Sequence, residues 1–402
     1  MRMRNSSAIL VLLVALAFSF MFTLTVAAVG ESFTELSAGS LHSVAVKTDG
    51  SLWMWGNMTN SSEPVQVEGL YDVVAVSAAD NHTLALKSDG TLWSWGDDWG
   101  SGTLGNGTMN ISNYTPERIL TDVTSMSAGG SHGMAIKTDG SLWAWGWNCD
   151  GQLGDGTTIN RLTPIKIMND VIYVSAGDTC TFAIKTDKSL WSWGSNFIGQ
   201  LGDGSGKNQN RPVKVIEDVN SVFAGQGTAM AIKSDRSLWV WGSIPDATLE
   251  AQQSGWGGRI QPTPMRLMED IAAVSSSTHY SMLLKTDGSL WGWGYNNKGQ
   301  LGDGTTNPRQ TPVKVMDDVV SVATGGSGHT LAIKNDGSLW AWGNGYMGQL
   351  GNGKNSPDST SEYNIYCDSS VPIQVFTGEK LPNTRLDPAI GTDINRNPET
   401  GR

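Results

Sequence analysis

Charged residues, and basic residues in particular, are scarce in this chain of 402 residues. Only 16% of the residues are charged, against about 25% in an average globular protein. Lys and Arg total 27 against 38 Asp and Glu, which gives a formal net charge of −11. A surface of that sign repels phosphate backbones and anionic headgroups, so we expect no nucleic acid partner and no binding to a membrane surface.

Cysteine is also scarce, with Cys149, Cys180 and Cys367 as the only three. Three cysteines cannot form the framework of a disulfide-rich domain, so the core must come from packing. The chain instead contains 49 Gly and 17 Trp. So many aromatic side chains exclude a disordered protein, and glycine beside tryptophan indicates many short strands joined by tight turns.

The N-terminus has the pattern of an export signal. Arg2 and Arg4 precede an apolar run from Ala8 to Val29, and Val26-x-Ala28 is the small-residue pattern of a cleavage site. We predict a signal peptide over residues 1–28. The alternative is an uncleaved anchor, because the run approaches the roughly 20 residues that span a bilayer. Either outcome places the rest of the chain outside, as a secreted or cell-surface protein whose only membrane contact is this segment.

Internal repetition is the strongest signal in the sequence. The tetrapeptide Trp-x-Trp-Gly recurs in steps of 40, 50, 48, 48, 52 and 49 residues, and it begins at Trp53, Trp93, Trp143, Trp191, Trp239, Trp291 and Trp340. An apolar-Ala-apolar-Lys segment and an Asp-Gly, Asp-Lys or Asp-Arg turn precede it, which predicts a hairpin. Both faces of the Trp-containing strand are apolar, so each sheet must be covered on both sides.

Further strands complete each unit. A Gly-Gln-Leu-Gly loop follows the tryptophans at Gly151, Gly199, Gly299 and Gly348, and in altered form at 102–107. A proline opens a third strand, and Asp-Val-x-x-Val-Ser-Ala-Gly predicts a fourth. We predict an all-β, seven-bladed β-propeller over residues 31–380, with four antiparallel strands per blade. Phe33–Ala38 has the fourth-strand pattern and is predicted to close the ring by joining the last blade, and residues 381–402 are predicted to be a disordered polar tail.

The unit Ala-Gly-x-x-His, Asp-Gly-Ser-Leu-Trp-x-Trp-Gly and Gly-Gln-Leu-Gly resembles the regulator of chromosome condensation repeat, whose members are seven-bladed propellers. The first unit lacks the Gly-Gln-Leu-Gly loop, and 243–258 replaces it in the fifth. The resemblance implies two kinds of function. The eponymous nuclear protein is a guanine nucleotide exchange factor for Ran that also docks on nucleosomes. Similar secreted bacterial propellers bind and inhibit β-lactamases, and the export signal favours this exported, bacterial type.

Four histidines recur in register, eleven residues before the first tryptophan of their units: His42, His82, His132 and His329. Equivalent positions on neighbouring sheets lie about 10 Å apart, whereas Zn–N bonds are about 2 Å. We therefore predict no metal site and no cofactor. The histidines are expected to be structural, each bonded to the turn that opens its blade.

No nucleophile, base and orienting group gather in the sequence, so we predict a binding scaffold and no enzyme. The expected partner is an extracellular or cell-surface protein, bound by a monomer. Two alternatives stay open: a lectin-like module for glycans or cell wall, and an exchange factor as the resemblance implies.

The loops after Trp-Gly carry aromatic residues whose offsets from the tryptophan pair vary, so the repeat does not require them. We predict that they form the ligand-binding face, and the alternative is that each ring packs on the neighbouring blade. These residues are Trp99, Trp147, Phe197, Trp256, Tyr295 and Tyr346. Cys149 lies in such a loop and Cys180 in a turn of the next unit on the same face. They are candidates for a disulfide, against the alternative of two buried thiols, and Cys367 stays free.

Overall fold

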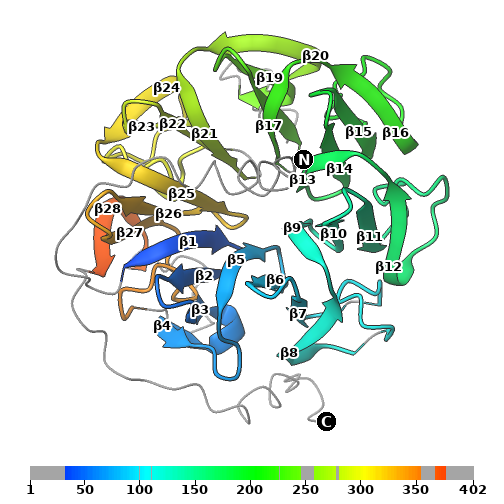
Figure 1. Ribbon diagram of the computed structural model, residues 1–402. Coiled ribbons are helices and arrows are strands. Elements are labelled where there is room, and N and C mark those ends of the chain that lie inside the picture. The colour runs from blue at the N-terminus through cyan, green and yellow to red at the C-terminus, as the bar shows by residue number, and fades with distance from the viewer. Residues whose placement is uncertain are drawn as a thin grey trace, which may run out of the picture. The chain divides into compact units, whose positions relative to one another are not determined.

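The computed structural model describes residues 32–98, 100–109, 111–225, 227–245, 258–277, 280–354 and 367–376. They belong to one compact unit, Glu31–Arg402. Seven four-stranded antiparallel sheets form a ring around a central axis (Figure 1). The predicted seven-bladed propeller is thus confirmed. The predicted signal peptide and the predicted polar tail lie outside the described residues.

Each blade uses four consecutive strands. The innermost strands are β1 (Phe33–Ala38), β5 (Val73–Ala78), β9 (Val123–Ala128), β13 (Val171–Ala176), β17 (Val219–Ala224), β21 (Ile271–Ser276) and β25 (Val319–Gly325). The second strands are β2 (His42–Lys47), β6 (His82–Lys87), β10 (His132–Lys137), β14 (Cys180–Lys185), β18 (Thr228–Lys233), β22 (Tyr280–Lys285) and β26 (His329–Lys334).

The third strands contain the tryptophan pairs: β3 (Leu52–Gly56), β7 (Leu92–Gly96), β11 (Leu142–Gly146), β15 (Leu190–Gly194), β19 (Leu238–Pro245), β23 (Leu290–Gly294) and β27 (Leu339–Gly343). The outer strands are β4 (Ser61–Gln66), β8 (Asn113–Leu120), β12 (Arg161–Met168), β16 (Gln209–Ile216), β20 (Gly258–Met268), β24 (Arg309–Met316) and β28 (Ser369–Phe376). A short 3-10 turn, η1 (Asn57–Thr59), follows β3. The recurrent prolines lie in the outer strands, at the sheet edge where a missing N–H is tolerated.

The predicted closure of the ring is wrong. The strand β1 pairs with β2 in the first blade, and the last blade is β25–β28. The Asp-Val strand therefore opens each blade instead of ending it. The Asp-Val strand is joined by short connections both to the outer strand before it and to the second strand after it. The repeat pattern therefore does not show with which of the two it shares a sheet. An aspartate in the left-handed conformation marks the boundary, as at Asp170 between β12 and β13 with φ of 62°.

The ring closes by side-by-side packing of the first and last blades. The strand β1 contacts β25 and β26, and the rings of Phe33 and Phe376 meet edge to face with centroids 5.2 Å apart. Trp55 of the first blade lies in one apolar cluster with Leu331 and Leu350 of the last. Every other apolar cluster likewise joins two consecutive blades. The core of this protein therefore lies between blades.

The predicted hairpin turns between the second and third strands are present in all seven blades. Glycine takes the left-handed position in five of them, as at Gly140 with φ of 74°. Lys188 and Arg236 take the same position in the other two, with φ of 62° and 65°. A side chain in this conformation costs roughly 1–2 kcal/mol, so these two turns are strained relative to the glycine turns.

Candidate functional site

Two sets of connections emerge at the same end of every blade. The first set joins the innermost to the second strand, and the second set joins the third to the outer strand. Backbone bonds tie the two sets together, as from Trp147 N to Ser131 O and from Ser195 N to Thr179 O, both 2.9 Å. We call this end of the propeller the loop face.

The predicted aromatic residues that the structure describes all lie on the loop face. The exposed fraction is 75% for Phe197, 45% for Tyr295 and 37% for Trp147. Tyr346 is half-buried. The first three rings are therefore accessible from solvent on this face. Trp99 and Trp256 lie outside the described residues.

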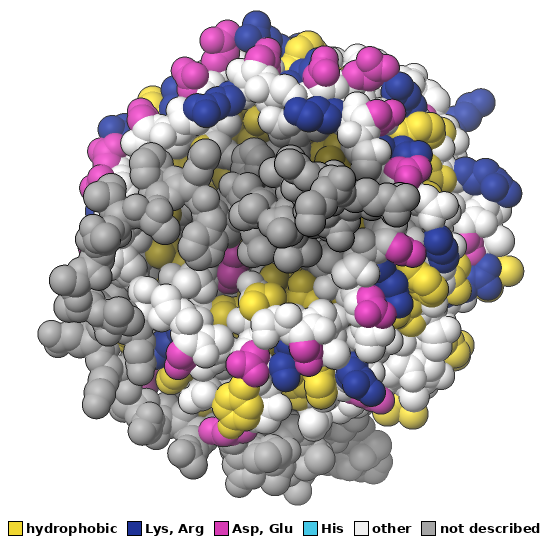
Figure 2. Space-filling view, in the orientation of Figure 1, with side chains coloured by type: hydrophobic (Ala, Val, Ile, Leu, Met, Phe, Trp, Pro, Cys, Tyr) yellow, Lys and Arg dark blue, Asp and Glu magenta, His cyan; other side chains and the backbone are white. Residues whose placement is uncertain are grey.

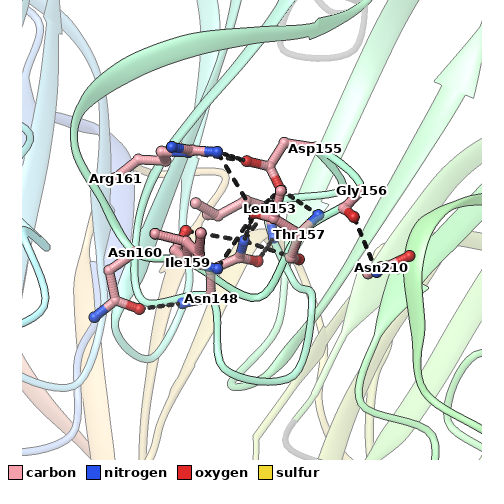
Figure 3. A network of polar contacts seen from close by, with 9 residues as sticks. All are labelled: Asn148, Leu153, Asp155, Gly156, Thr157, Ile159, Asn160, Arg161 and Asn210. Carbon is pink, nitrogen blue, oxygen red and sulfur yellow. Dashed lines mark hydrogen bonds and ion pairs between the residues drawn. The ribbon is translucent and has the colours of Figure 1, made fainter.

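The loops that carry these aromatics are fixed by their own hydrogen bonds (Figure 3). In the third blade, Asn148 Nδ2 donates to Asp155 Oδ1 and to the carbonyls of Thr157 and Ile159, at 3.1–3.2 Å. The Asn148 Oδ1 atom accepts from Leu153 N at 2.9 Å. Arg161 forms an ion pair with Asp155. Asn196 and Asn296 make equivalent contacts in their blades, so these loops are organised before any ligand binds.

The Gly-Gln-Leu-Gly loops also join neighbouring blades, which the sequence did not reveal. The Gln152 carbonyl accepts from the indole Nε1 of Trp193 in the next blade at 2.8 Å. The backbone N–H of Gly156 donates to the carbonyl of Asn210 in the next outer strand at 2.8 Å. The loop leucine, Leu153, is fully buried. The same indole-to-carbonyl bond recurs at Trp55, Trp145, Trp241 and Trp342.

The histidines are structural, but their partners differ from the predicted ones. Nε2 of His132 lies 2.9 Å from Oγ1 of Thr181, in the next blade and not in its own turn. The Thr181 hydroxyl donates to the Gln152 carbonyl, so it accepts the proton of His132 Nε2. Nε2 of His329 contacts Oγ of Ser43 in the same way across the closure of the ring. His42 bonds to Thr83.

Burial keeps these histidines neutral. It lowers the pKa of His42, His132 and His329 to about 3 and that of His82 to about 4. Accordingly, no histidine is visible among the coloured atoms of Figure 2. His82 has no hydrogen-bond partner at either ring nitrogen. The residue in the third blade that is equivalent to Thr181 is Gly133, which has no hydroxyl to offer. A Cβ at Gly133 would lie 2.2 Å from a ring carbon of Trp145. His279 lies outside the described residues, and Tyr280 takes the equivalent position with its hydroxyl donating to His329 O.

The predicted disulfide is not formed in the structure. Cys149, Cys180 and Cys367 are all free thiols, with Cys149 exposed and Cys180 buried. Burial, followed by the nearby charge of Asp178, raises the pKa of Cys180 to about 12. A thiol with that pKa is a poor nucleophile at neutral pH.

The axis opens on the loop face in a cavity of about 130 Å³ lined by the turns after the innermost strands. Asp80 and Asp178 lie in its lining, and Ser40 donates to Asp80 at 2.5 Å. Burial and the charges of Asp80 and Asp150 raise the pKa of Asp178 to about 6. Three ligating side chains do not gather anywhere in the described residues in a way that would hold a metal ion. No helix in the described part of the chain has the length and apolarity to cross a bilayer.

The acidic and basic side chains are mixed on the surface. In the view of Figure 2, Lys or Arg side chains lie beside Asp or Glu around the rim. Three such pairs, each spaced three residues apart on an outer strand or just after it, are Lys214–Glu217, Arg266–Glu269 and Lys314–Asp317. Exposed pairs of this kind contribute about 0–1 kcal/mol to stability. Because each pair combines one positive and one negative group, these pairs add no net charge to the rim.

The architecture defines a seven-bladed β-propeller whose blades are joined by tryptophans and loop carbonyls. Comparison with known families agrees. A model of the RCC1-like domain matches residues 21–242, more than half of the chain. Models of the regulator of chromosome condensation (RCC1) repeat match residues 287–333 and 336–385. The chain belongs to the RCC1-like domain family.

Individual relatives are more distant. The RCC2 homolog of Danio rerio is 39% identical over 54 residues, which cover 13% of this chain and 11% of that protein. Human WBSCR16 superposes with a TM-score of 0.67 at 20% identity, covering 77% of this chain and 88% of its own. Prp20p of Saccharomyces cerevisiae, a protein studied for its binding to Gsp1p and histones, gives 0.67 at 21% identity, over 87% and 88% of the chains. These two structures share the fold.

Proposed function

We propose that this propeller is an exported, non-catalytic scaffold that binds another protein through its loop face. The observation that carries the proposal is the exposure of Trp147, Phe197 and Tyr295 on the loop face. Large aromatic side chains dominate the binding energy of protein interfaces. The hydrogen bonds within their loops reduce the ordering cost of binding.

Two further features support a binding role without chemistry. The four histidines of the register are buried and neutral, and they lie between blades. None of these four is therefore available as a general base on the loop face. The basic N-terminus and the apolar run after it support export. Fractionation of cells that produce the full chain tests this part, and recovery of the chain only from the cytosol would contradict it.

The binding role is tested with the full chain immobilised and the extracellular proteins of its own cells as the probe. We expect Phe197→Ala and Tyr295→Ala to lose at least tenfold in retention while thermal unfolding stays unchanged. Ile172→Ala is the matched control, because Ile172 is 47% exposed near the start of β13, at the opposite end of the propeller. Equal loss with the Ile172 variant, or unchanged retention by all variants, would contradict the loop face as the site.

The same aromatic faces also suit sugar rings, which stack on flat side chains. A polysaccharide array with the same variants separates this second candidate: binding there, without protein capture, indicates a lectin-like module. Nucleotide release from a small GTPase tests the exchange-factor alternative. Acceleration by the wild-type chain would contradict the non-catalytic proposal.

A further inference from the structure

The sequence contains Asn-x-Ser/Thr sequons in only one part of the propeller. They begin at Asn57, Asn60, Asn81, Asn106, Asn110 and Asn113, with one more at Asn5 before the described part of the chain. None of the asparagines after Asn113 begins such a sequon. This tripeptide is the acceptor for N-linked glycans in exported proteins. All the sequons of the propeller therefore belong to the first two blades.

The fold places the described sequons on the loop face. Asn57 and Asn60 lie between β3 and β4. Asn81 lies in the turn between β5 and β6, and Asn106 and Asn113 lie after β7. Asn60 is exposed, and the other four are partly exposed. Because the first two blades are neighbours in the ring, two stretches of chain about fifty residues apart present acceptors on one sector of this face.

The contacts of Asn60, Asn106 and Asn113 leave room for modification. Asn60 is in the left-handed conformation, with φ of 51°, just before β4. The amides of Asn106 and Asn113 both donate to Oε2 of the exposed Glu117, at 2.9 and 3.3 Å. A glycosylated amide keeps one N–H, so each asparagine is still able to donate. The side chains of Met109 and Ile111 are 50% and 57% exposed between these asparagines, and a glycan would cover them.

We propose that the first two blades form a glycan-bearing sector of the loop face, with Asn60 and Asn113 as its principal acceptors. In the reaction, C1 of an oligosaccharide carried on a lipid pyrophosphate forms a bond to the asparagine Nδ2. The C1–O bond to the pyrophosphate breaks, the amide loses one proton, and the lipid pyrophosphate leaves with that proton. The reaction involves no oxidation or reduction.

This sector has a consequence for binding. The exposed Trp147, Phe197 and Tyr295 lie in the third, fourth and sixth blades, which contain no sequon. Glycans are bulky and hydrophilic, so they would keep a partner away from the first two blades. The partner would then approach across the remaining blades. This inference depends on the export that we propose above.

The test uses the full chain produced in a eukaryotic secretory host, with intact mass measured before and after peptide N-glycosidase and glycopeptides mapped. Two matched pairs separate loss of the sequon hydroxyl from its retention: Ser62→Ala with Ser62→Thr, and Thr115→Ala with Thr115→Ser. We expect each Ala variant to lose the mass of one glycan and its partner variant to keep it. Thr115 is exposed, so its two variants are expected to leave the fold intact, and thermal unfolding checks the Ser62 variants, whose site is partly exposed.

Exported chain whose Asn60 and Asn113 peptides are unmodified would overturn the glycan proposal. A chain that stays in the cytosol would contradict export instead. In that case residues 1–28 are replaced by a signal of the host and the same peptides are mapped. Unmodified peptides in that secreted chain would again overturn the glycan sector, and modified ones would support it independently of the native N-terminus.

Discussion

In the described part of the chain, five of the seven joints between blades contain an indole bonded to a loop carbonyl of the preceding blade, and two do not. Trp342 represents the first group, with its Nε1 atom 2.9 Å from Gln300 O. In the joint between the first and second blades, Met58 packs in the cluster of Trp95 instead. In the joint between the fifth and sixth, Ile244 packs in the cluster of Trp293, and Trp293 donates to Gln310 O in its own blade.

The difference shows what each joint requires. An apolar loop side chain lies in the cluster of the second tryptophan in six joints: Leu350, Leu153, Leu201, Leu301, Met58 and Ile244. In the joint between the second and third blades, the equivalent loop residue Leu104 is buried. The polar contact to the loop carbonyl is present only where the Gly-Gln-Leu-Gly loop, or its altered form, is kept. Apolar packing against the second tryptophan is therefore what the joints have in common. The loops of the first and fifth blades do not have to supply the carbonyl, so they differ from the others in length and sequence.

The largest expected effect is the loss of a loop leucine from a regular joint. Leu201 is fully buried against the cluster of Trp241. Leu201→Ala should lower the free energy of unfolding by about 2–5 kcal/mol, the usual range for a buried leucine. Met58→Ala, at a half-buried position, should cost about 1 kcal/mol or less. Urea unfolding measures both, and equal costs would contradict the comparison.

Acid should expose a second difference between joints. The folded pKa of His82 is about 4, below the unfolded value near 6.5. The unfolded chain therefore binds more protons between these values, and stability falls as the pH is lowered through that window. Replacing His82 by Leu should recover about 2–3 kcal/mol at pH 4.5 relative to pH 7.5.

His132→Leu is the matched variant for that experiment. It removes a similar acid penalty but also the bond to Thr181, so it should cost about 1 kcal/mol more than His82→Leu at pH 7.5. The raised pKa of Asp178 makes the folded chain more stable as the pH falls, which is opposite to the effect of the histidines. This contribution is the same in both variants. Identical stabilities of the two variants at pH 7.5 would show that the bond between blades contributes nothing.

Substitution in a strained hairpin turn should change the free energy of unfolding by less than the preceding variants, and should raise it. Lys188 is in the left-handed conformation, so Lys188→Gly relieves strain at the expense of a more flexible unfolded chain. We expect a gain of about 0.5–1 kcal/mol. Gly140→Ala, in the equivalent turn of the third blade, should lose stability. Chemical denaturation of the pair checks the sign, and a loss with Lys188→Gly would refute the strain.

The smallest effect on stability is expected on the loop face. Phe197 is 75% exposed, and surface substitutions usually change stability by less than about 0.5 kcal/mol. Phe197→Ala should therefore melt within a degree or two of the wild-type chain. A larger drop in melting temperature would show that the ring is a packing element and would remove it from the proposed site.

The sequence by itself determined the repeat, the strands and the face on which the loops emerge. These features depend on contacts within one unit: alternation places the tryptophans, and a left-handed residue after aspartate makes the hairpin, as at Gly140. The register of His132 within its unit also followed from the repeat. The aromatic loop residues were found because Phe197 and Tyr295 occupy positions that the repeat does not require.

Only the tertiary structure decided which strands share a sheet and what joins one blade to the next. Short connections lie on both sides of an innermost strand such as β13, and the left-handed aspartates between consecutive blades, such as Asp170, are read from backbone geometry. The partners of His132 and Trp193 lie 49 and 41 residues away, beyond any local pattern. Cys149 and Cys180 share a face without being bonded, because sharing a face fixes no sulfur–sulfur distance. Contacts between blades depend on how the ring closes, and that is a property of all seven sheets together.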